Sequence, residues 1–226
     1  MNGAIINAAA ILCGGAIGIL LKGRVNEKIT HAIMRAMGLC VCVIGISGAL
    51  GGDMMLMVAS LALGVSVGEF FAIDEKLNAF GIFLQRRFGK KTGDGSFAQG
   101  FVAAALLFCV GAMSIVGSLD SGLRDDRSII VTKSLIDAVS SVALASTFGV
   151  GVLFSAAAVF FYQGSIEIFA GVLQNILTEE LITQITAVGG VMIFGIGANM
   201  AFETKIKVAN LLPGFFFACG YYAIFL

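Results

Sequence analysis

Residues 18–38, GILLKGRVNEKITHAIMRAMG, recur in altered form at residues 171–189, GVLQNILTEELITQITAVG. Both copies consist of an apolar segment, a short polar loop and a second apolar segment. The loop of the first copy is basic, with Lys22, Arg24 and Lys28, whereas the loop of the second copy is acidic and contains no base. Because basic membrane loops stay in the cytoplasm, the two copies are expected to face opposite sides of a bilayer. Such an inverted repeat is typical of secondary transporters.

The composition also indicates a membrane protein. Of the 226 residues, 58% are hydrophobic and only 12% are charged, and the mean hydropathy is +1.00. So little polar surface cannot cover a soluble globule of this length, which assigns the chain to a lipid bilayer. The formal net charge is zero and no nucleic-acid-binding motif is present, so we expect no nucleic-acid partner.

Eight segments are apolar and long enough to predict membrane-spanning helices, because a span needs about 20 such residues. They are 3–21, 33–50, 54–72, 98–118, 131–148, 152–174, 185–202 and 207–226. We therefore expect an all-α integral membrane protein, with spans 1–3 and 6–8 forming the inverted repeat around a central hairpin of spans 4 and 5. The whole chain, 1–226, would be one transmembrane domain made of repeat A (1–72), a connector (73–97), the central hairpin (98–148) and repeat B (152–226).

The distribution of basic residues predicts the orientation. Eleven of the 14 bases lie in the stretches 22–35, 73–97 and 203–207, which fall on one side if there are eight spans. This predicts a cytoplasmic side for these loops and an outside position for both termini. The exception is the loop at 119–133, where acids including Asp120 are expected to pair locally with three bases. The connector at 73–97 has helical apolar spacing, so it is either an amphipathic helix on the inner leaflet or a solvated linker.

The fifth span holds the most polar side chains. Lys133 and Asp137 are four residues apart and can pair, while Ser134, Asp137 and Ser141 share one helix face. Ionisable groups inside a membrane cost about 2.5–3.5 kcal/mol on insertion scales and mark functional sites by default. Two interpretations remain open: a polar seam satisfied by neighbouring helices, or a face that lines a path for water or substrate.

Further polar candidates follow the fifth span. Ser146, Thr147, Gly149 and Gly151 form either a tight turn or a helix break whose exposed backbone binds ions. Gln163 and Glu167 are four residues apart on one face of the sixth span.

The sequence contains no recognisable motif for enzyme catalysis or metal binding. The chain has one histidine, and its five cysteines lie inside apolar segments, so no zinc site and no Ser–His or Cys–His catalytic arrangement can be assembled. We expect no enzyme activity, no metal and no cofactor.

Several blocks of the chain resemble a family of bacterial multi-pass membrane proteins of unknown function, the YdfK-like or YqgA-like family. The blocks are Met37-Gly38-Leu39, Ile44 to Gly48, Gly68-Glu69, Gly111 to Met113, Gly117-Ser118, Asp120 to Leu123, Lys133 to Asp137, Ala145 to Val152 and Tyr162 to Gly164. The resemblance covers nearly the whole chain. It implies a bacterial inner-membrane protein and no particular substrate.

These observations favour a small secondary transporter or channel of the bacterial inner membrane that conveys a small ion or solute. The bilayer would be its environment, and a homodimer its expected assembly. The alternative is a scaffold or accessory subunit that binds a partner through its glycine-rich helix faces, since Gly14 and Gly18, and Gly64 and Gly68, have the spacing of close helix contacts.

Overall fold

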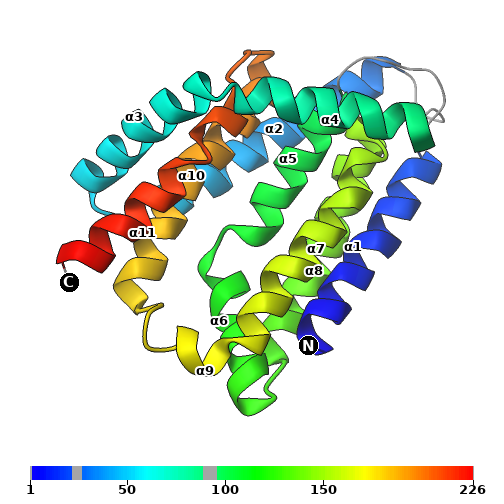
Figure 1. Cartoon of the computed structure of the whole chain (residues 1–226). Helices are drawn as coiled ribbons and strands as arrows, with labels where there is room; N and C mark the ends of the chain where they lie inside the picture. The colour runs from blue at the N-terminus through cyan, green and yellow to red at the C-terminus, as the bar shows by residue number, and fades with distance from the viewer. Residues whose placement is uncertain (1, 22–26, 89–95, 226) are drawn as a thin grey trace. The chain divides into compact units, whose positions relative to one another are not determined.

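The computed structural model describes residues 2–21, 27–88 and 96–225, and all regular structure in these ranges is helical (Figure 1). In chain order the elements are α1 (Asn2–Leu21), α2 (Glu27–Ala49), α3 (Met54–Phe70), α4 (Ile73–Phe88), α5 (Ser96–Cys109), α6 (Ala112–Arg124), α7 (Ser128–Phe148), α8 (Gly151–Ile168), α9 (Ala170–Leu173), α10 (Glu179–Phe202), the 3₁₀ helix η1 (Val208–Leu211) and α11 (Gly214–Phe225). Residues 89–95 of the expected connector, and Lys22 and Arg24 of the first basic loop, lie outside the described residues.

The membrane character of the helices is confirmed, but the expected number of spans is not. Within the described ranges α1, α7, α8 and α10 are each long and apolar enough to cross a membrane. Two bent pairs would raise the number to six if each counts as one span: 34–49 with α3, bent by 119°, and 97–109 with α6, bent by 60°. The structure therefore has four to six candidate spans where eight were expected. The difference arises because windows of mean hydropathy register apolar length and not bends.

The expected central hairpin, 98–148, shows where this matters. The segment 98–118 was expected to be one continuous span, but α5 ends at Cys109 and α6 starts at Ala112. The hairpin region therefore holds three helices, α5, α6 and α7. At the other end of the chain, the expected span 207–226 begins as the 3₁₀ turn η1 before α11 starts at Gly214.

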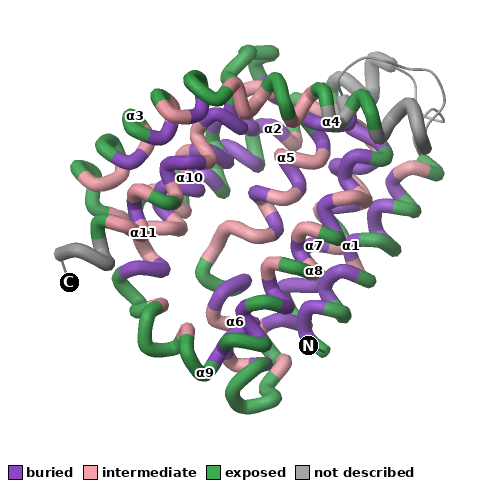
Figure 2. Tube along the Cα trace, in the orientation of Figure 1, coloured by how far each residue is buried: buried purple, intermediate pink, exposed green. Residues whose placement is uncertain are grey.

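The chain divides into two compact units. Unit 1 consists of Met1–Thr30 and Phe80–Thr178, and it contains α1 and α5 to α9. In it α1 packs along α7 and α8, and α5 packs on α8 (Figure 1). The buried positions of α1 recur every three or four residues, so one side of this helix faces the unit (Figure 2).

Glycine explains how closely α1 approaches α7. A Cβ at Gly14 would lie 2.2 Å from the Ala138 carbonyl oxygen, and one at Gly18 would lie 2.3 Å from the Val142 carbonyl oxygen. Any larger residue would push the two backbones apart, so the expected small-residue contact is confirmed here.

Unit 2 consists of His31–Ala79 and Glu179–Leu226. Here α3 and α10 each pack on α11, and α3 also contacts η1. The backbone of α2 lies directly against that of α10, since a Cβ at Gly45 would be 2.4 Å from the Phe194 amide nitrogen.

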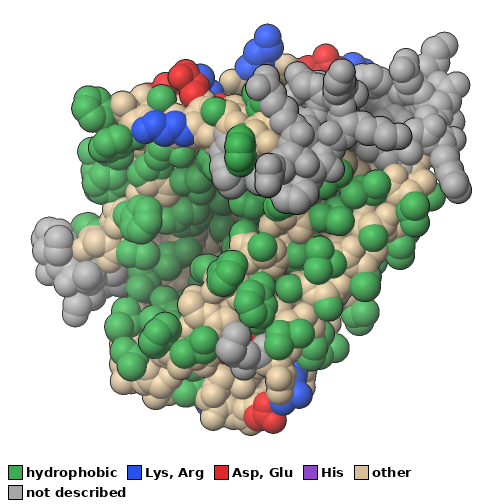
Figure 3. All heavy atoms as spheres, turned by 45° about the vertical axis from the view of Figure 1, so that its right-hand side comes forward, with side chains coloured by type: hydrophobic (Ala, Val, Ile, Leu, Met, Phe, Trp, Pro, Cys, Tyr) green, Lys and Arg blue, Asp and Glu red, His purple; other side chains and the backbone are tan. Residues whose placement is uncertain are grey.

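Large apolar side chains remain on the surface of both units. Leu20 and Leu135 are 67% and 68% exposed, and Met55 and Phe70 are 83% and 82% exposed. Hydrophobic side chains cover much of the face shown in Figure 3. Such a surface suits lipid acyl chains rather than water.

A polar loop after α10 is tied down by one side chain. The Asn199 amide accepts from Ile206 N–H at 2.9 Å and from Thr204 Oγ1 at 2.6 Å, and it donates to the Ile206 carbonyl at 2.8 Å. Lys207, which follows Ile206 in this loop, donates a hydrogen bond from its Nζ to Glu69 Oε2 at 3.4 Å. This hydrogen bond raises the pKa of Lys207.

Replacing Asn199 with alanine should loosen this loop. Three hydrogen bonds are lost, each contributing about 0.5–1.5 kcal/mol, so we expect the apparent Tm to fall and trypsin to cleave after Lys205 faster. Thr204→Val is the matched control, because it removes only one of the three bonds and should produce a smaller change. Equal cleavage rates in all three proteins would contradict the assigned role of Asn199.

Candidate functional site

Five side chains from four helices of unit 1 form a continuous hydrogen-bonded network, which we call the polar cluster: Asn7 (α1), Ser114 (α6), Lys133 and Asp137 (α7), and Gln163 (α8). Asp137 Oδ2 accepts from Lys133 Nζ at 2.5 Å and from Asn7 Nδ2 at 3.0 Å. Asn7 Nδ2 also lies 3.1 Å from Gln163 Oε1, and Gln163 Nε2 donates to Ser114 Oγ at 2.9 Å.

All five members of the cluster are buried. Asn7, Ser114 and Gln163 have no exposed surface, and Asp137 and Lys133 are 3% and 6% exposed. Desolvating an ion pair costs several kcal/mol per ion, and the mutual attraction of the charges offsets this only with additional hydrogen bonds. The Lys133–Asp137 pair is therefore not expected to add much to the stability of the fold. A functional role is the stronger interpretation of its burial.

Local sequence explains why these side chains meet. Lys133 and Asp137 are four residues apart on α7 and so lie one above the other on one face. The glycines of α1 let this helix approach α7 closely, which brings Asn7 to Asp137 although 130 residues separate them. Asn7 is five residues after the start of α1 and Gln163 is five before the end of α8, so both lie about 7–8 Å from a helix end.

One group in the cluster has no hydrogen-bond partner among the described residues. Asn7 Oδ1 is fully buried and accepts no hydrogen bond, although the other end of the same amide donates to Asp137 and Gln163. A buried acceptor without a donor costs about 1–3 kcal/mol. The cluster is therefore not fully satisfied by the part of the chain that the structure describes.

The break between α5 and α6 lies beside the cluster. Gly111 has φ 136° and ψ 145°, a conformation that only glycine adopts readily, and nothing lies within 4 Å of a Cβ placed there. Ser114 stands in the first turn of α6, where its amide donates to the Gly111 carbonyl at 3.0 Å. Apart from such a bond to the capping residue, the amides of the first turn have no partner inside the helix, so in a bilayer this break must border water, ligand or other protein.

The last residue of α5 lies close enough to the ion pair to feel its charges. Cys109, the last residue of α5, is within electrostatic range of both Lys133 and Asp137. The discontinuous helix therefore joins the cluster through Ser114, on the α6 side of its break.

Several residues predicted as site candidates lie outside this network. Ser134 Oγ donates to the Ile130 carbonyl at 2.6 Å, and Ser141 Oγ donates to the Ala138 carbonyl at 2.9 Å and to the Ile11 carbonyl at 3.2 Å. Both serines are buried on the predicted face of α7, but they serve helix contacts. They extend the polar face without joining the ion pair.

The segment from Ser146 to Gly151 is a turn and not a broken span. Gly149, at φ 77°, ends α7, and α8 starts at Gly151. A Cβ at Gly151 would lie 2.1 Å from the Phe97 carbonyl oxygen, so this glycine serves packing. The hydroxyls of Ser146 and Thr147 both bond to the Ala143 carbonyl, as helix-end serines and threonines commonly do. Of the two alternatives predicted for this segment, the structure shows the tight turn.

Glu167 is buried beside the cluster and holds the beginning of α1. Its Oε1 accepts from the Ala4 amide at 2.7 Å, where a carboxylate is favoured by the positive end of the helix dipole. A Cβ at Gly3 would lie 2.5 Å from this oxygen, so the approach requires glycine.

The charged residues that precede and begin α7 pair locally, as expected. Arg124 lies 3.5 Å from Asp120, Arg127 pairs with Asp125, and Lys133 pairs with Asp137. Asp126 Oδ1 accepts from the Ser128 amide at 2.9 Å and from its hydroxyl at 2.6 Å, which lowers the pKa of Asp126. Asp120, in the last turns of α6, therefore belongs to this peripheral charge pairing and not to the cluster.

Two members of the cluster were not predicted as site residues. Asn7 lies in a strongly apolar segment and Ser114 next to a break that hydropathy does not reveal. The available signal was chemical: a lone asparagine inside a span needs partners, and the Asp137 carboxylate was the strongest acceptor that the apolar segments offered.

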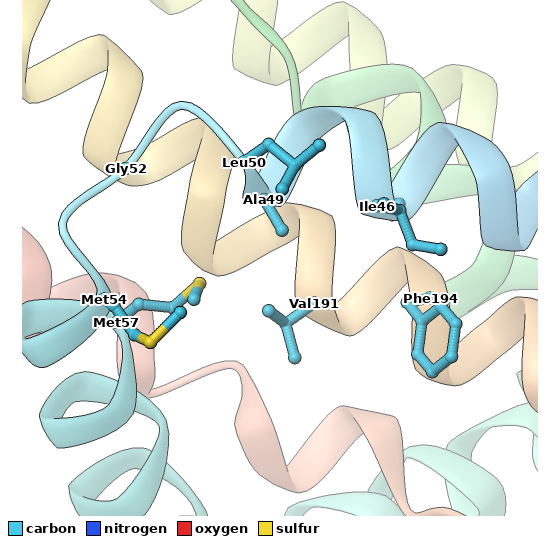
Figure 4. Close-up of a pocket in the computed structure, with 9 residues that line it drawn as sticks. Ile46, Ala49, Leu50, Gly52, Met54, Met57, Val191 and Phe194 are labelled. Atoms are coloured by element: carbon cyan, nitrogen blue, oxygen red, sulfur yellow. The ribbon is translucent and has the colours of Figure 1, made fainter.

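The described residues offer little that could form a metal site or another ligand site. No group of three or more His, Cys, Asp and Glu side chains there could hold a metal ion. In unit 2 a groove of about 350 Å³ lies at the bend from α2 to α3 and is bordered by Val191 and Phe194 of α10 (Figure 4). Its lining side chains, which include Ile46, Met54 and Met57, are apolar and offer no orienting polar group.

Long apolar helices around a buried charged network define a multi-pass membrane protein. The chain belongs to the family described as "Protein of unknown function (DUF554)", whose model matches residues 2–223. It is 33% identical over 218 residues to the uncharacterized membrane protein YdfK of Bacillus subtilis (strain 168), covering 94% of this chain and 92% of YdfK. It is 29% identical over 222 residues to the uncharacterized protein YqgA of Escherichia coli (strain K12), covering 96% and 94%. No solved structure matches the chain.

Proposed function

We propose that this protein is a small secondary transporter or channel of the bacterial inner membrane, without enzymatic activity, and that the polar cluster is its binding site. The observation that carries the proposal is the buried Lys133–Asp137 pair, linked through Asn7 and Gln163 to Ser114 at a helix break. Discontinuous helices with polar groups at the break recur where transporters bind ions and substrates.

The inverted repeat is the second part of the proposal, and the pairing of helices supports it. Helices at equivalent places in the two repeats lie against each other: α1 on α8, α2 on α10 and α3 on α11. The first pair is antiparallel. Gly3, near the start of α1, meets Glu167 near the end of α8, and Gly15, further along α1, meets Leu153 near the start of α8. Antiparallel contact between equivalent helices is expected of inverted repeats.

The glycine faces weigh against the alternative role as a scaffold. A Cβ at Gly18, Gly38, Gly64 or Gly68 would collide with backbone atoms of another helix of the same unit. These faces are consequently occupied within the chain and are not free for a partner.

The orientation is testable with reporter fusions at Lys205 and Glu180. These residues flank opposite ends of α10, a helix of 24 residues that is about 36 Å long, so a spanning α10 separates them. We expect a cytoplasmic signal at Lys205, which lies in a basic loop, and an outside signal at Glu180. Signals from one side at both positions would contradict the proposed topology.

The binding site is testable by thiol labelling. In a variant without the five native cysteines, Ser114→Cys places a thiol in the cluster, and Ser155→Cys places one at an equally buried position, where Ser155 Oγ bonds to the Val152 carbonyl. The proposal requires a state in which water reaches the polar cluster, here taken as populated at roughly 1–10%. A membrane-impermeant maleimide should then label position 114 on the order of 10–100-fold more slowly than an exposed thiol. Position 155 should not be labelled. Equal protection of both positions would refute the transport proposal and favour the scaffold.

A further inference from the structure

We infer that the polar cluster takes up a proton and a small monovalent anion together, with Asp137 as the proton acceptor and Lys133 as the group that binds the anion. This inference rests on the proposed function and names its substrate class. In the absence of substrate, the Asp137 carboxylate occupies the position on Lys133 that an entering carboxylate would take.

Charge balance leads to this pairing. The Lys133–Asp137 pair is buried and sums to zero charge. A proton that adds to Asp137 forms one O–H bond and leaves the Lys133 ammonium buried without its counter-ion, which is strongly unfavourable. An anion that enters with the proton restores neutrality, because the ammonium hydrogen bond passes from Asp137 to the anion. Release reverses both steps, and no other bond is made or broken.

The donors around the carboxylate suit an anion. Lys133 Nζ and Asn7 Nδ2 both donate to the single oxygen Asp137 Oδ2, and they form a preformed pair of N–H donors for any carboxylate that replaces it. An ammonium is a compact charge that binds one anionic group without requiring the planar fork of arginine.

Apart from Glu167, the helices packed around the pair bring only uncharged groups to it among the residues that the structure describes. Of the helices packed around it, α1 brings Asn7, α6 brings Ser114, and α5 brings Cys109. The other titratable group nearby is Glu167, four residues beyond Gln163 on α8 and bonded to the Ala4 amide. Asp120 and Arg124 pair with each other at the far end of α6.

A metal cation fits this site less well than a proton. Hard cations take about six or more oxygen ligands as a rule, whereas the cluster offers one carboxylate whose acceptor is already held by an ammonium. The described residues also contain no metal-binding group of three acidic, histidine or cysteine side chains.

The test uses the full-length purified protein and sodium formate, the smallest carboxylate, with the apparent Tm as readout. Wild type should gain roughly 2–4 °C with formate at about pH 5 and nothing at about pH 8. Asp137→Asn should gain at both pH values, because its Lys133 has no counter-ion at either. The double variant Lys133→Met/Asp137→Asn should respond at neither pH, and Asp120→Asn, in the pair with Arg124, should behave as wild type.

Each other outcome decides the question. Equal formate effects in wild type and the double variant would overturn the inference, since they would report a general salt effect. A pH response without a formate response would also overturn it, because Asp137 would then take up its proton without an anion. If Asp137→Asn does not fold, the pH dependence of wild type against the Lys133→Met variant decides instead. The labelling of Ser114→Cys tests the transport proposal independently, so the two failures are distinguishable.

Discussion

Asp137→Leu is expected to lower the free energy of unfolding by about 3–5 kcal/mol, because it leaves a buried charge without its partner. The Lys133 ammonium is 6% exposed and would remain buried with no opposite charge. Asn7 would lose the acceptor that it now reaches at 3.0 Å. Asp137→Asn keeps an acceptor for Asn7 and should cost less.

A double-mutant cycle separates the ion pair from packing. Lys133→Met combined with Asp137→Leu removes both charges, so the double variant should recover most of the stability lost in either single variant. Unfolding in a denaturing detergent series, followed by helix content, measures the four proteins. Additive losses would show that Lys133 and Asp137 do not depend on each other.

The second large effect is expected at Gly45→Ala, in the contact between α2 and α10. The added Cβ would stand 2.4 Å from the Phe194 amide nitrogen and 2.7 Å from the Gly190 carbonyl oxygen, and backbone atoms cannot move aside cheaply. Overpacking of this kind typically costs about 1–3 kcal/mol and sometimes more.

Gly195→Ala is the matched control, because Gly195 is a glycine of α10 whose close neighbours are side chains and not the backbone of α2. Its Cβ would meet only the Val208 and Ile206 side chains, at 3.3 and 3.7 Å, which can shift. The apparent Tm should therefore fall clearly for Gly45→Ala. For Gly195→Ala we expect a smaller fall, which corresponds to a loss of less than about 1 kcal/mol in the free energy of unfolding. Similar losses at both positions would contradict the assigned α2–α10 contact.

The predictions from the sequence were best where chemistry is local. Lys133 and Asp137 meet because a helix places residues four apart together, and this holds whatever the other helices do. The contacts at Gly14 and Gly18 follow in the same way, since small residues four apart on an apolar helix indicate close packing.

The partners of the ion pair depend on contacts over long sequence distances. Asn7 is 130 residues from Asp137, and Gln163 is 49 residues from Ser114, so no spacing rule connects them. The helix break at Gly111 was not predicted from the sequence, for a different reason. It stands alone between apolar residues, whereas Gly149 and Gly151 form the more conspicuous pair and merely make a turn.

Labelling of Ser114→Cys from each side of the membrane is the most direct test of a transporting polar cluster. In the cysteine-free background, right-side-out and inside-out vesicles are treated with an impermeant maleimide, with Asp137 intact and with Asp137→Asn. Alternating access predicts that the thiol reacts from both sides in the intact protein and that Asp137→Asn shifts the ratio of the two rates, because the substitution biases one state. Protection from both sides in both proteins would contradict it and leave the polar cluster as a packing element.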